Sequence, residues 1–542
     1  MTKHRSFLTY IVSMLILFSA FSAHAQRKGM ESITDKELFT HLSFIASDAL
    51  EGRDTPSRGL KTAAQYLATW AASYGFQPIL QNGSFIQEIP LEITSVSQSR
   101  SRITLKSGLG DQVFYFPQAF GGRFNSEGSF SGEVIFVGYG VDAVDLGWDD
   151  YGDLDYTGKV VVMLDGELPE DHVLRERIPG ERRSPVSGRR NAPRMKGATA
   201  VLSVISEERE RWLADGGFTF DTAERGRFIS NQPDSRGSQQ TGQGGAPAPF
   251  VQAEIRHDVA TAILGVSRRE LSNMFSMIAM ERQVDRRELN STRVDITIGL
   301  DRRMGHTQNV VAYLEGSDSR LKNEYVLFGA HYDHMGAREG RVWNGADDDG
   351  SGTVALLEIA QAMTIERPKR SVIIVWHTGE EKGLQGARYF VNNSPVPIES
   401  MSAQINIDMI GRNDPNSVFP IGAGRLSTEL DAIMKQQNDR NTKLILDYTY
   451  DAPDDPNRFY SRSDHYMYAQ FGVPIIFFFA GTHDDYHQHT DTIEKIDFNK
   501  MRNVTRLAYL IGYEVGNKNE LLKLDADPEV ITRGKHNVST GR

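Results

Sequence analysis

The chain has 542 residues, too many for a single compact hydrophobic core, so its length alone predicts two or three domains. Apolar side chains make up 39% and charged side chains 24% of it, which are the proportions of ordinary soluble globular proteins. The formal charge of −11 comes without a basic stripe, so we expect no nucleic-acid partner. Cysteine is absent, which excludes disulfides, thiolate metal ligands and a lipid-carrying cysteine.

The first 25 residues have the pattern of a secretory signal peptide. Basic side chains within residues 3–5 precede an apolar stretch over 7–21, and the small residues of 23–25 suit a cleavage site. The apolar stretch is shorter than the roughly 20 residues that span a bilayer, which disfavours a retained anchor. We therefore expect export to the periplasm or the cell exterior, with Gln26 as the first mature residue and no stable membrane anchor after cleavage.

Residues 26–110 are expected to begin the main domain. From Asp35 to Tyr74 the apolar residues recur at helical spacing, which predicts two helices. Further along, the runs VIFVGYG and KVVVML with nearby Gly-Asp turns predict a small β-rich unit, which we place at 111–293. Within this unit we expect an alanine-rich helix around 197–206. We also expect a mobile loop over 231–249, where almost nothing can be buried.

Residues 294–520 alternate between predicted strands and predicted helices. The runs NVVAYL, YVLFGA, SVIIVW, AQINI and VPIIFFFA are short, continuous and rich in β-branched or aromatic residues. Such runs are typical of strands that are buried on both faces of a parallel sheet. The predicted fold class is therefore α/β, with a mixed, largely parallel central sheet flanked by helices and interrupted by the β-rich insert. Residues 521–542 are expected to be a C-terminal tail.

A cluster of acidic or histidine residues follows almost every one of these strands. Because parallel strands deliver their carboxyl ends to one edge of a sheet, we expect the clusters to meet there. Together they offer two histidines and three carboxylates, which is the ligand count of a two-metal hydrolytic site. The clusters are HYD at 331–333, GADDDGSG at 345–352, GEE at 379–381, NID at 406–408 and YHQH at 486–489.

Each cluster also has an ordinary interpretation. An acidic triplet such as 347–349 is usually a solvated turn, and adjacent glutamates usually lie on a wet helix face. A single histidine is more often on the surface, or satisfied in the core, than bound to a metal. Five clusters in order, each following a predicted strand, favour a metal site over these alternatives.

The motifs HYDHMG, NGADDDGSG, GEEKGLQGARYF, INIDMIGR, SDH and YHQHTDT resemble those of the co-catalytic, two-zinc aminopeptidase family. That family includes the bacterial leucyl aminopeptidases and their glutamate carboxypeptidase relatives. The resemblance covers most of 294–513 and, more weakly, the N-terminal helices with LEGRDT. The insert, with VIFVGYG and YTGKVVVML, looks like a protease-associated domain, which commonly interrupts or precedes such catalytic domains.

This resemblance implies two Zn²⁺ ions and assigns five protein ligands to them. His331 and Asp408 would bind one ion, and Glu381 and His487 would bind the other. Asp348, the middle aspartate of the three, would bridge both ions. A bridging carboxylate holds two ions roughly 3.5–4 Å apart, so that one hydroxide can lie between them.

The resemblance also implies roles for side chains that do not bind metal. Glu380 would be the general base that takes a proton from the metal-bound water and later gives it to the leaving amine. The hydroxyl of Tyr460, three residues before SDH, would help to stabilise the tetrahedral oxyanion. Asp333 is well placed to accept the second ring proton of the histidine ligand two residues before it. Asp464 and His465 would shape the pocket wall.

Three assignments stay open at this point. His489 stands where the family commonly has proline and competes with His487 for the last ligand position, although the tyrosine directly before His487 favours that residue. His334 is expected to be a supporting pocket residue rather than a ligand. A shift of one residue in the acidic triplet would make Asp347 or Asp349 the bridging carboxylate.

These roles imply an exported, zinc-dependent exopeptidase that acts on peptide substrates. The leading prediction is an aminopeptidase that works through a metal-bridging hydroxide and a glutamate base. The alternative enzyme is a carboxypeptidase of the glutamate-releasing kind, which needs a cationic clamp that no motif identifies. An inactive receptor-like relative or a single-zinc glutaminyl cyclase is disfavoured because all five ligands and the base are present. The preferred terminal residue, the role of the insert, the oligomeric state and the metal bound in vivo stay open.

Overall fold

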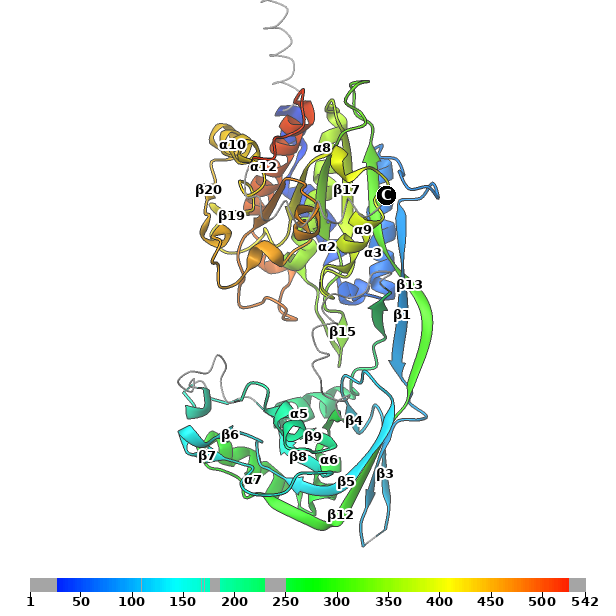
Figure 1. Ribbon diagram of the computed structural model, residues 1–542, viewed down its shortest axis with the longest axis vertical. Helices are drawn as coiled ribbons and strands as arrows, with labels where there is room; N and C mark the ends of the chain where they lie inside the picture. Colours follow the sequence, from blue (N-terminus) through cyan, green and yellow to red (C-terminus); the bar gives the residue numbers. More distant parts are fainter. Residues whose placement is uncertain are drawn as a thin grey trace, which may run out of the picture. The chain divides into compact units, whose positions relative to one another are not determined.

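The chain divides into two compact units (Figure 1). The first consists of the segments up to Leu91, Gly305–Ala337 and from Arg341 onward, and the second of Glu92–Met304 with Arg338–Gly340. The computed structural model describes residues 27–108, 110–166, 168–169, 171–175, 186–229 and 250–525. The predicted signal peptide and the predicted loop over 231–249 lie outside the described residues, as does the tail beyond residue 525.

A nine-stranded mixed sheet has most of its strands in the first unit. In order across the sheet, its strands are β10 (Arg225–Phe228), β1 (Ile86–Val96), β13 (Leu300–Leu314), β17 (Ser371–His377), β14 (Tyr325–His331), β18 (Met401–Ile407), β21 (Ile475–Phe479), β19 (Ser417–Ile421) and β20 (Ile445–Leu446). The four neighbours from β17 to β21 run parallel, while β13 and β19 pair antiparallel on either side of them. The predicted α/β class with a largely parallel centre is confirmed.

Helices cover both faces of this sheet. One core contains α2 (Asp35–Ile45), α3 (Arg58–Ser73), α8 (Gly352–Ile365), α10 (Thr428–Gln437) and α12 (Phe498–Asn517), and another contains α9 (Gln385–Asn392) and α11 (His465–Ala469). Strand β14 contributes to both, because Val326 and Phe328 lie in the first core and Leu327 lies in the second. Alternate side chains of a strand point to opposite faces, so a continuous apolar run is buried on both sides.

Local signals explain where the helices that frame the site begin. Helices α2 and α3 are the two predicted N-terminal helices, and their N-caps Thr34 and Ser57 accept backbone hydrogen bonds from Glu37 and Leu60. Helix α8 is buried almost all round, as expected for a helix that is apolar on every face. It follows a π-helical turn, Ala346–Ser351, which carries the three aspartates to the sheet edge.

The second unit is the predicted β-rich insert. Its main sheet has eight strands, which in order across the sheet are β3 (Gln112–Tyr115), β2 (Arg102–Lys106), β12 (Arg287–Ile298), β5 (Gly128–Phe136), β8 (Val160–Leu164), β9 (Ala200–Val204), β11 (Val251–Ile255) and β4 (Phe120–Gly121). Helices α5 (Glu207–Gly216), α6 (His257–Leu264) and α7 (Arg268–Ala279) accompany them. A separate hydrophobic core fills this unit, so it is a second compact body rather than a loop of the first.

Two predictions about the insert are wrong. The expected helix around 197–206 is the strand β9, because AVLSV is fully buried between the parallel strands β8 and β11. The expected limits of 111–293 are too narrow, because the unit runs from Glu92 to Met304. Strands β2 and β12 pair with each other inside its sheet, with Val294 opposite Leu105, so the residues around both strands belong to the insert.

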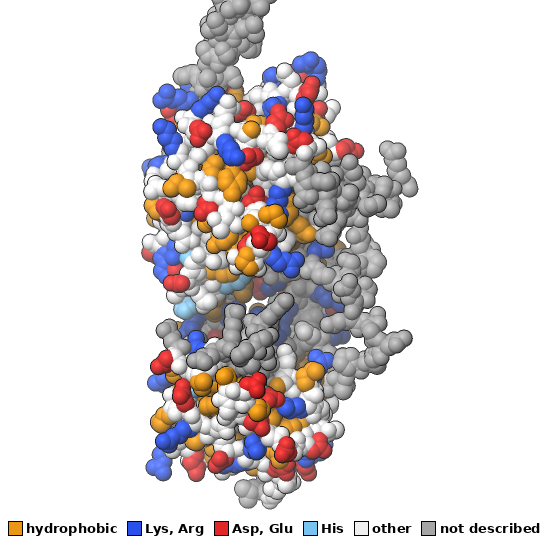
Figure 2. Space-filling view, turned by 60° about the vertical axis from the view of Figure 1, so that its left-hand side comes forward, with side chains coloured by type: hydrophobic (Ala, Val, Ile, Leu, Met, Phe, Trp, Pro, Cys, Tyr) orange, Lys and Arg blue, Asp and Glu red, His pale blue; other side chains and the backbone are white. Residues whose placement is uncertain are grey.

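The surface charges and the helices relate to two expectations from the sequence, namely that the chain has no nucleic-acid partner and no stable membrane anchor. On the face drawn in Figure 2, lysine and arginine side chains are interspersed with aspartate and glutamate rather than gathered in one stripe. Within the described segments, no helix combines the length and the apolar character that crossing a membrane requires.

Candidate metal centre

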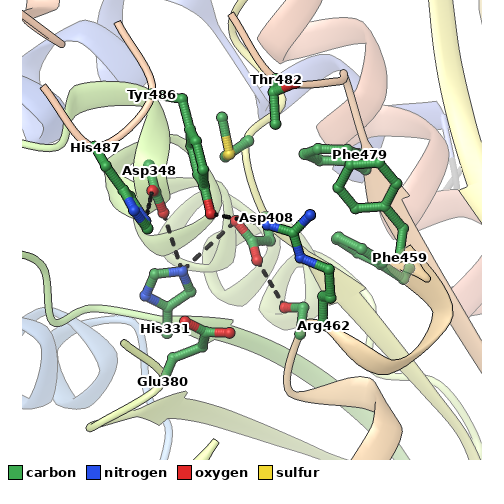
Figure 3. Close-up of a pocket in the computed structure, with 13 residues that line it drawn as sticks. His331, Asp348, Glu380, Asp408, Phe459, Arg462, Phe479, Thr482, Tyr486 and His487 are labelled. Carbon is green, nitrogen blue, oxygen red and sulfur yellow. Dashed lines mark hydrogen bonds and ion pairs between the residues drawn. The ribbon is translucent and has the colours of Figure 1, made fainter. Parts of the chain in front are cut away.

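The predicted ligands meet at the carboxyl ends of the parallel strands, as the sequence led us to expect. His331 is the last residue of β14, Asp408 directly follows β18, and Glu380 and Glu381 lie shortly after β17. Parallel neighbours in one sheet end at the same edge, so side chains from segments far apart in the chain come together there. His331, Asp348, Glu380, Asp408 and His487 line one pocket (Figure 3).

Asp348 lies between two sets of predicted ligands. Nε2 of His331 is 3.3 Å from Oδ1 of Asp348 and 3.6 Å from Oδ1 of Asp408. Nε2 of His487 is 3.2 Å from Oδ2 of Asp348 and 3.1 Å from Oε2 of Glu381. Each histidine thus faces a different oxygen of the same carboxylate, which is the arrangement expected of a bridging ligand.

The aspartates on either side of Asp348 are occupied by backbone groups. Oδ1 of Asp349 accepts hydrogen bonds from the amides of Gly352 and Met409, and its Oδ2 accepts one from the amide of His331. Oδ1 of Asp347 accepts from the amide of Gly411 at 2.6 Å. The ligand atoms of Asp349, His331 and Asp408 also lie within 4.8 Å of one another. The three amides already bound to Asp349 favour Asp348 as the bridging carboxylate.

The structure separates the rival histidines. His489 is exposed and packs near the ring of Trp343, with 5.9 Å between the ring centroids. His487 lines the pocket, so its geometry favours it as the last ligand. His334 is fully buried, and its Nδ1 lies 2.9 Å from Oε1 of Glu381 and 3.9 Å from Oδ2 of Asp348. His334 is expected from the sequence to be a supporting pocket residue, and the structure places one of its ring nitrogens in direct contact with a predicted ligand.

The predicted ligands create a negative electrostatic potential, which favours the binding of cations. Burial would lower the pKa of His487, but its hydrogen bonds to Asp348 and Glu381 outweigh burial and raise the pKa to about 10. Burial also opposes a proton on His331, yet the charge of Asp408 and the contact with Asp348 raise the pKa of His331 well above its usual value. Histidines hold protons this strongly only in a strongly negative potential, where a bound cation is stabilised in the same way.

The donor atoms of the cluster also fit metal ions. Oδ2 of Asp348 and Oε1 of Glu381 are buried, and the groups that face them among the described residues are the ring nitrogens of His487 and His334, which can themselves bind a metal ion. Unsatisfied buried carboxylate oxygens are costly, and a coordinated ion removes that cost. Imidazole nitrogens and carboxylate oxygens are ligands that Zn²⁺ accepts in proteins. The residues present are therefore compatible with the two ions that the sequence predicted.

Glu380 lies in the pocket beside the ligands without bonding to them. Burial raises the pKa of its carboxyl well above the usual range, and the neighbouring charge of Glu381 adds to this shift. Its backbone amide donates to Oδ1 of Asp333 at 3.1 Å, which fixes the chain at this point. A carboxylate with a raised pKa, directed at the reaction site, is suited to accept and return a proton.

The predicted role of Asp333 toward His331 is only partly met. Nδ1 of His331 lies 3.1 Å from the backbone oxygen of Asp333, whereas the carboxylate is 3.8 Å away. The carboxylate instead accepts from the amide of Glu380 and the hydroxyl of Thr55. The backbone carbonyl, which no sequence pattern can indicate, is therefore the nearer acceptor for the second ring nitrogen.

Tyr460 is not among the residues that line the pocket. The guanidinium carbon of Arg425 lies 4.2 Å from the centroid of its ring. Its role in stabilising an oxyanion remains a prediction that the pocket lining does not support. Asp464 and His465 are buried, and His465 stacks on Phe477, which does line the pocket.

Arg53 is a supporting residue whose role the sequence did not reveal, although it lies in LEGRDT. Its side chain is fully buried and donates to four backbone carbonyls. The acceptors are those of Tyr332 at 2.8 Å, Ile45 at 2.5 Å, Asn344 at 2.7 Å and Gly345 at 3.0 Å. The carbonyl of Tyr332 lies in the histidine cluster, those of Asn344 and Gly345 lie at the start of the aspartate cluster, and that of Ile45 ends α2, so one guanidinium holds both cluster segments together and ties them to this helix.

We expect Arg53→Met to lower the free energy of unfolding by about 3 kcal/mol, because it leaves buried carbonyls without donors. Arg58→Met is the matched control, because the Arg58 side chain is 82% exposed and pairs only at the surface. Chemical denaturation of both variants measures the difference. Equal stability of the two variants would show that Arg53 does not hold these segments.

Residues 309–511 match the family model for peptidase family M28. A probable leucine aminopeptidase 2 from Aspergillus oryzae is 30% identical over 226 residues, which are 41% of this chain and 41% of the relative. A leucine aminopeptidase 1 from Ajellomyces dermatitidis is 29% identical over 223 residues, which are 38% of this chain and 56% of the relative. The chain thus spans roughly two fifths of the first relative's length. The predicted family resemblance is confirmed over this part of the chain.

Two solved structures are similar over most of the chain. A peptidase M28 precursor from Shewanella amazonensis has a TM-score of 0.52 and 17% identity, and the likeness covers 94% of this chain and 98% of that one. BSAP, a zinc aminopeptidase from Bacillus subtilis, has a TM-score of 0.50 and 16% identity, with 92% and 99% covered. At this level of identity the likeness concerns the fold, and it agrees with the predicted α/β class.

Proposed function

We propose that this chain is a two-zinc exopeptidase, and in particular an aminopeptidase that removes N-terminal residues from peptides. The observation that carries the proposal is the position of Asp348 between two ligand sets, with His331 and Asp408 on one side and His487 and Glu381 on the other. The family of the segment and the names of its relatives support the same activity.

The zinc ions, when bound, supply Lewis acidity that polarises the scissile carbonyl and acidifies the attacking water. The five predicted ligand side chains would hold the ions at the sheet edge. Glu380 accepts the proton of the attacking water and returns it to the leaving amine, a use that its buried position and raised pKa favour. Asp349 and Arg53 keep the ligand-bearing segments in place through their backbone hydrogen bonds.

A panel of leucyl substrates tests the activity and its polarity. We expect hydrolysis of leucyl p-nitroanilide that a chelator abolishes and added Zn²⁺ restores. We also expect that N-acetylation of the substrate abolishes cleavage, because an aminopeptidase must bind the free amine. Cleavage of the acetylated substrate at the rate of the free one would contradict aminopeptidase polarity.

His487→Ala is expected to lower the affinity for one of the two ions by about tenfold or more, because it removes one of the predicted ligands of that ion. His489→Ala is the control, since that side chain is exposed outside the pocket. Dialysis against buffered Zn²⁺, followed by elemental analysis, measures both variants. The assignment fails if His489→Ala loses the ion and His487→Ala keeps it.

The location of the enzyme and the identity of the insert rest on sequence patterns. The first 25 residues support export by a cleaved signal peptide to the periplasm or the exterior. The runs VIFVGYG and YTGKVVVML, which form parts of β5 and β8, support a protease-associated domain. Mass spectrometry of the mature N-terminus tests the first of these proposals, with Gln26 as the expected first residue.

A further inference from the structure

An arginine side chain, that of Arg462, lies in the pocket wall beside the predicted metal ligands. The pocket encloses about 350 Å³, including its open mouth. Beyond the ligands and the base, its lining includes aromatic and thioether side chains and one arginine, namely Met409, Phe459, Arg462, Phe477, Phe479 and Tyr486. Figure 3 shows the guanidinium of Arg462 between Tyr486 on one side and the rings of Phe459 and Phe479 on the other.

Neutral groups hold this guanidinium in place. One terminal nitrogen of Arg462 donates to the hydroxyl of Tyr486 at 3.2 Å, and its Cζ lies 4.7 Å from the centroid of the Phe459 ring. Among the described residues, Arg462 forms no ion pair with a carboxylate, whereas nearby Arg412 and Arg425 pair with aspartates. No carboxylate among the described residues therefore neutralises the charge of Arg462, so the guanidinium can pair with an anionic group of a bound substrate.

The next residue in the chain after Arg462 and the hydrogen-bond partner of its guanidinium both contact predicted ligands. Ser463, the next residue in the chain, donates to Oδ2 of Asp408 at 2.7 Å. Tyr486 stacks on His487, with ring centroids 3.9 Å apart. A substrate whose scissile bond lies at the ligands therefore places the groups next to that bond within reach of Arg462.

We propose that Arg462 binds a carboxylate of the substrate, so that the enzyme prefers peptides that present a carboxylate next to the scissile bond. The inference rests on the exopeptidase function proposed above and names its substrate class. A guanidinium binds a carboxylate with two parallel hydrogen bonds, and the aromatic side chains give the aliphatic part of an acidic residue an apolar wall. The carboxylate is either the side chain of an N-terminal aspartate or glutamate, or the free C-terminus of a short peptide.

Two substrate pairs distinguish these sources. The first compares glutamyl with glutaminyl p-nitroanilide, which differ in charge but hardly in shape. The second compares the dipeptide leucyl-alanine with its C-terminal amide. We expect kcat/KM to favour the charged member of one pair by about tenfold, which corresponds to ~1.4 kcal/mol. The preference should shrink at high salt, because Arg462 is exposed at the mouth of the pocket.

Arg462→Gln tests whether this side chain causes the preference. In this variant the favoured ratio should fall to within about twofold of one. Arg458→Gln is the matched control, because Arg458 is also an exposed arginine in the same loop and does not line the pocket. The inference is overturned if neither pair shows a preference in the wild type, or if the preference survives in Arg462→Gln.

A binding measurement separates this inference from the proposed function. Calorimetry of the zinc-loaded protein with glutamate and with glutamine needs no turnover. Tighter binding of glutamate that disappears in Arg462→Gln supports the carboxylate site even if every peptide substrate is left uncut, a result that would contradict only the exopeptidase activity. Equal binding of both amino acids, together with equal binding of acetyl-alanine and its amide as mimics of a C-terminus, overturns the carboxylate site while leucyl substrates are still hydrolysed.

Discussion

Glu380→Gln should lower the rate of peptide hydrolysis by about 10²–10⁴-fold while leaving the fold and both metal ions in place. The substitution keeps the shape of the side chain but removes its ability to accept a proton. Glu380 makes no ion pair with the predicted ligands, so we expect the metal content to be unchanged. Steady-state kinetics on leucyl p-nitroanilide, with elemental analysis of the same sample, measures both effects.

Glu399→Gln is the matched control for this prediction, because Glu399 is exposed and lies outside the pocket. It should hydrolyse the substrate at the wild-type rate. Near-normal turnover by Glu380→Gln would show that another group carries the proton. A loss of metal in Glu380→Gln would instead show that Glu380 is a ligand, which contradicts its assignment as the base.

Asp348→Ala should lose both metal ions and reduce activity to background. One carboxylate faces His331 through one oxygen and His487 through the other, so removing it weakens both ligand sets at once. Substitution of a ligand that serves only one ion should spare the other. Elemental analysis after dialysis, compared between Asp348→Ala and Asp408→Ala, measures this difference.

Asp454→Ala is the control for the change of charge, because Asp454 is an exposed aspartate outside the pocket. It should retain the wild-type metal content. Two ions retained per chain in Asp348→Ala would rule out the bridging role. The flanking residue Asp349, which already accepts three backbone hydrogen bonds, would then be the next candidate.

The central sheet could be predicted from the sequence because its strands carry a strong local signal. The runs YVLFGA and SVIIVW, for example, are short, apolar and buried on both faces. The sequence does not predict the strand β9, because AVLSV is short and includes alanine, and periodicity does not separate such a run from a buried helix. The limits of the insert were missed because β2 and β12 pair across nearly two hundred residues, and no local pattern encodes a distant partner.

The ligands could be predicted because metal sites need particular side chains at strand ends, and those side chains are visible in the sequence. The structure brings all five together and favours His487 over His489. Supporting contacts were harder to foresee. The acceptors of Arg53 are backbone carbonyls, and the uncompensated charge of Arg462 depends on which neighbours fold around it. Such properties belong to the folded chain rather than to a motif.

Zinc titration of the metal-depleted protein tests the central claim most directly. Leucyl p-nitroanilide hydrolysis is followed while Zn²⁺ is added, and the bound metal is counted by elemental analysis at each step. We predict saturation at two ions per chain, with activity that rises to its maximum as the sites fill. Binding of a single ion at full activity, or full activity without metal, would contradict a two-zinc site bridged by Asp348.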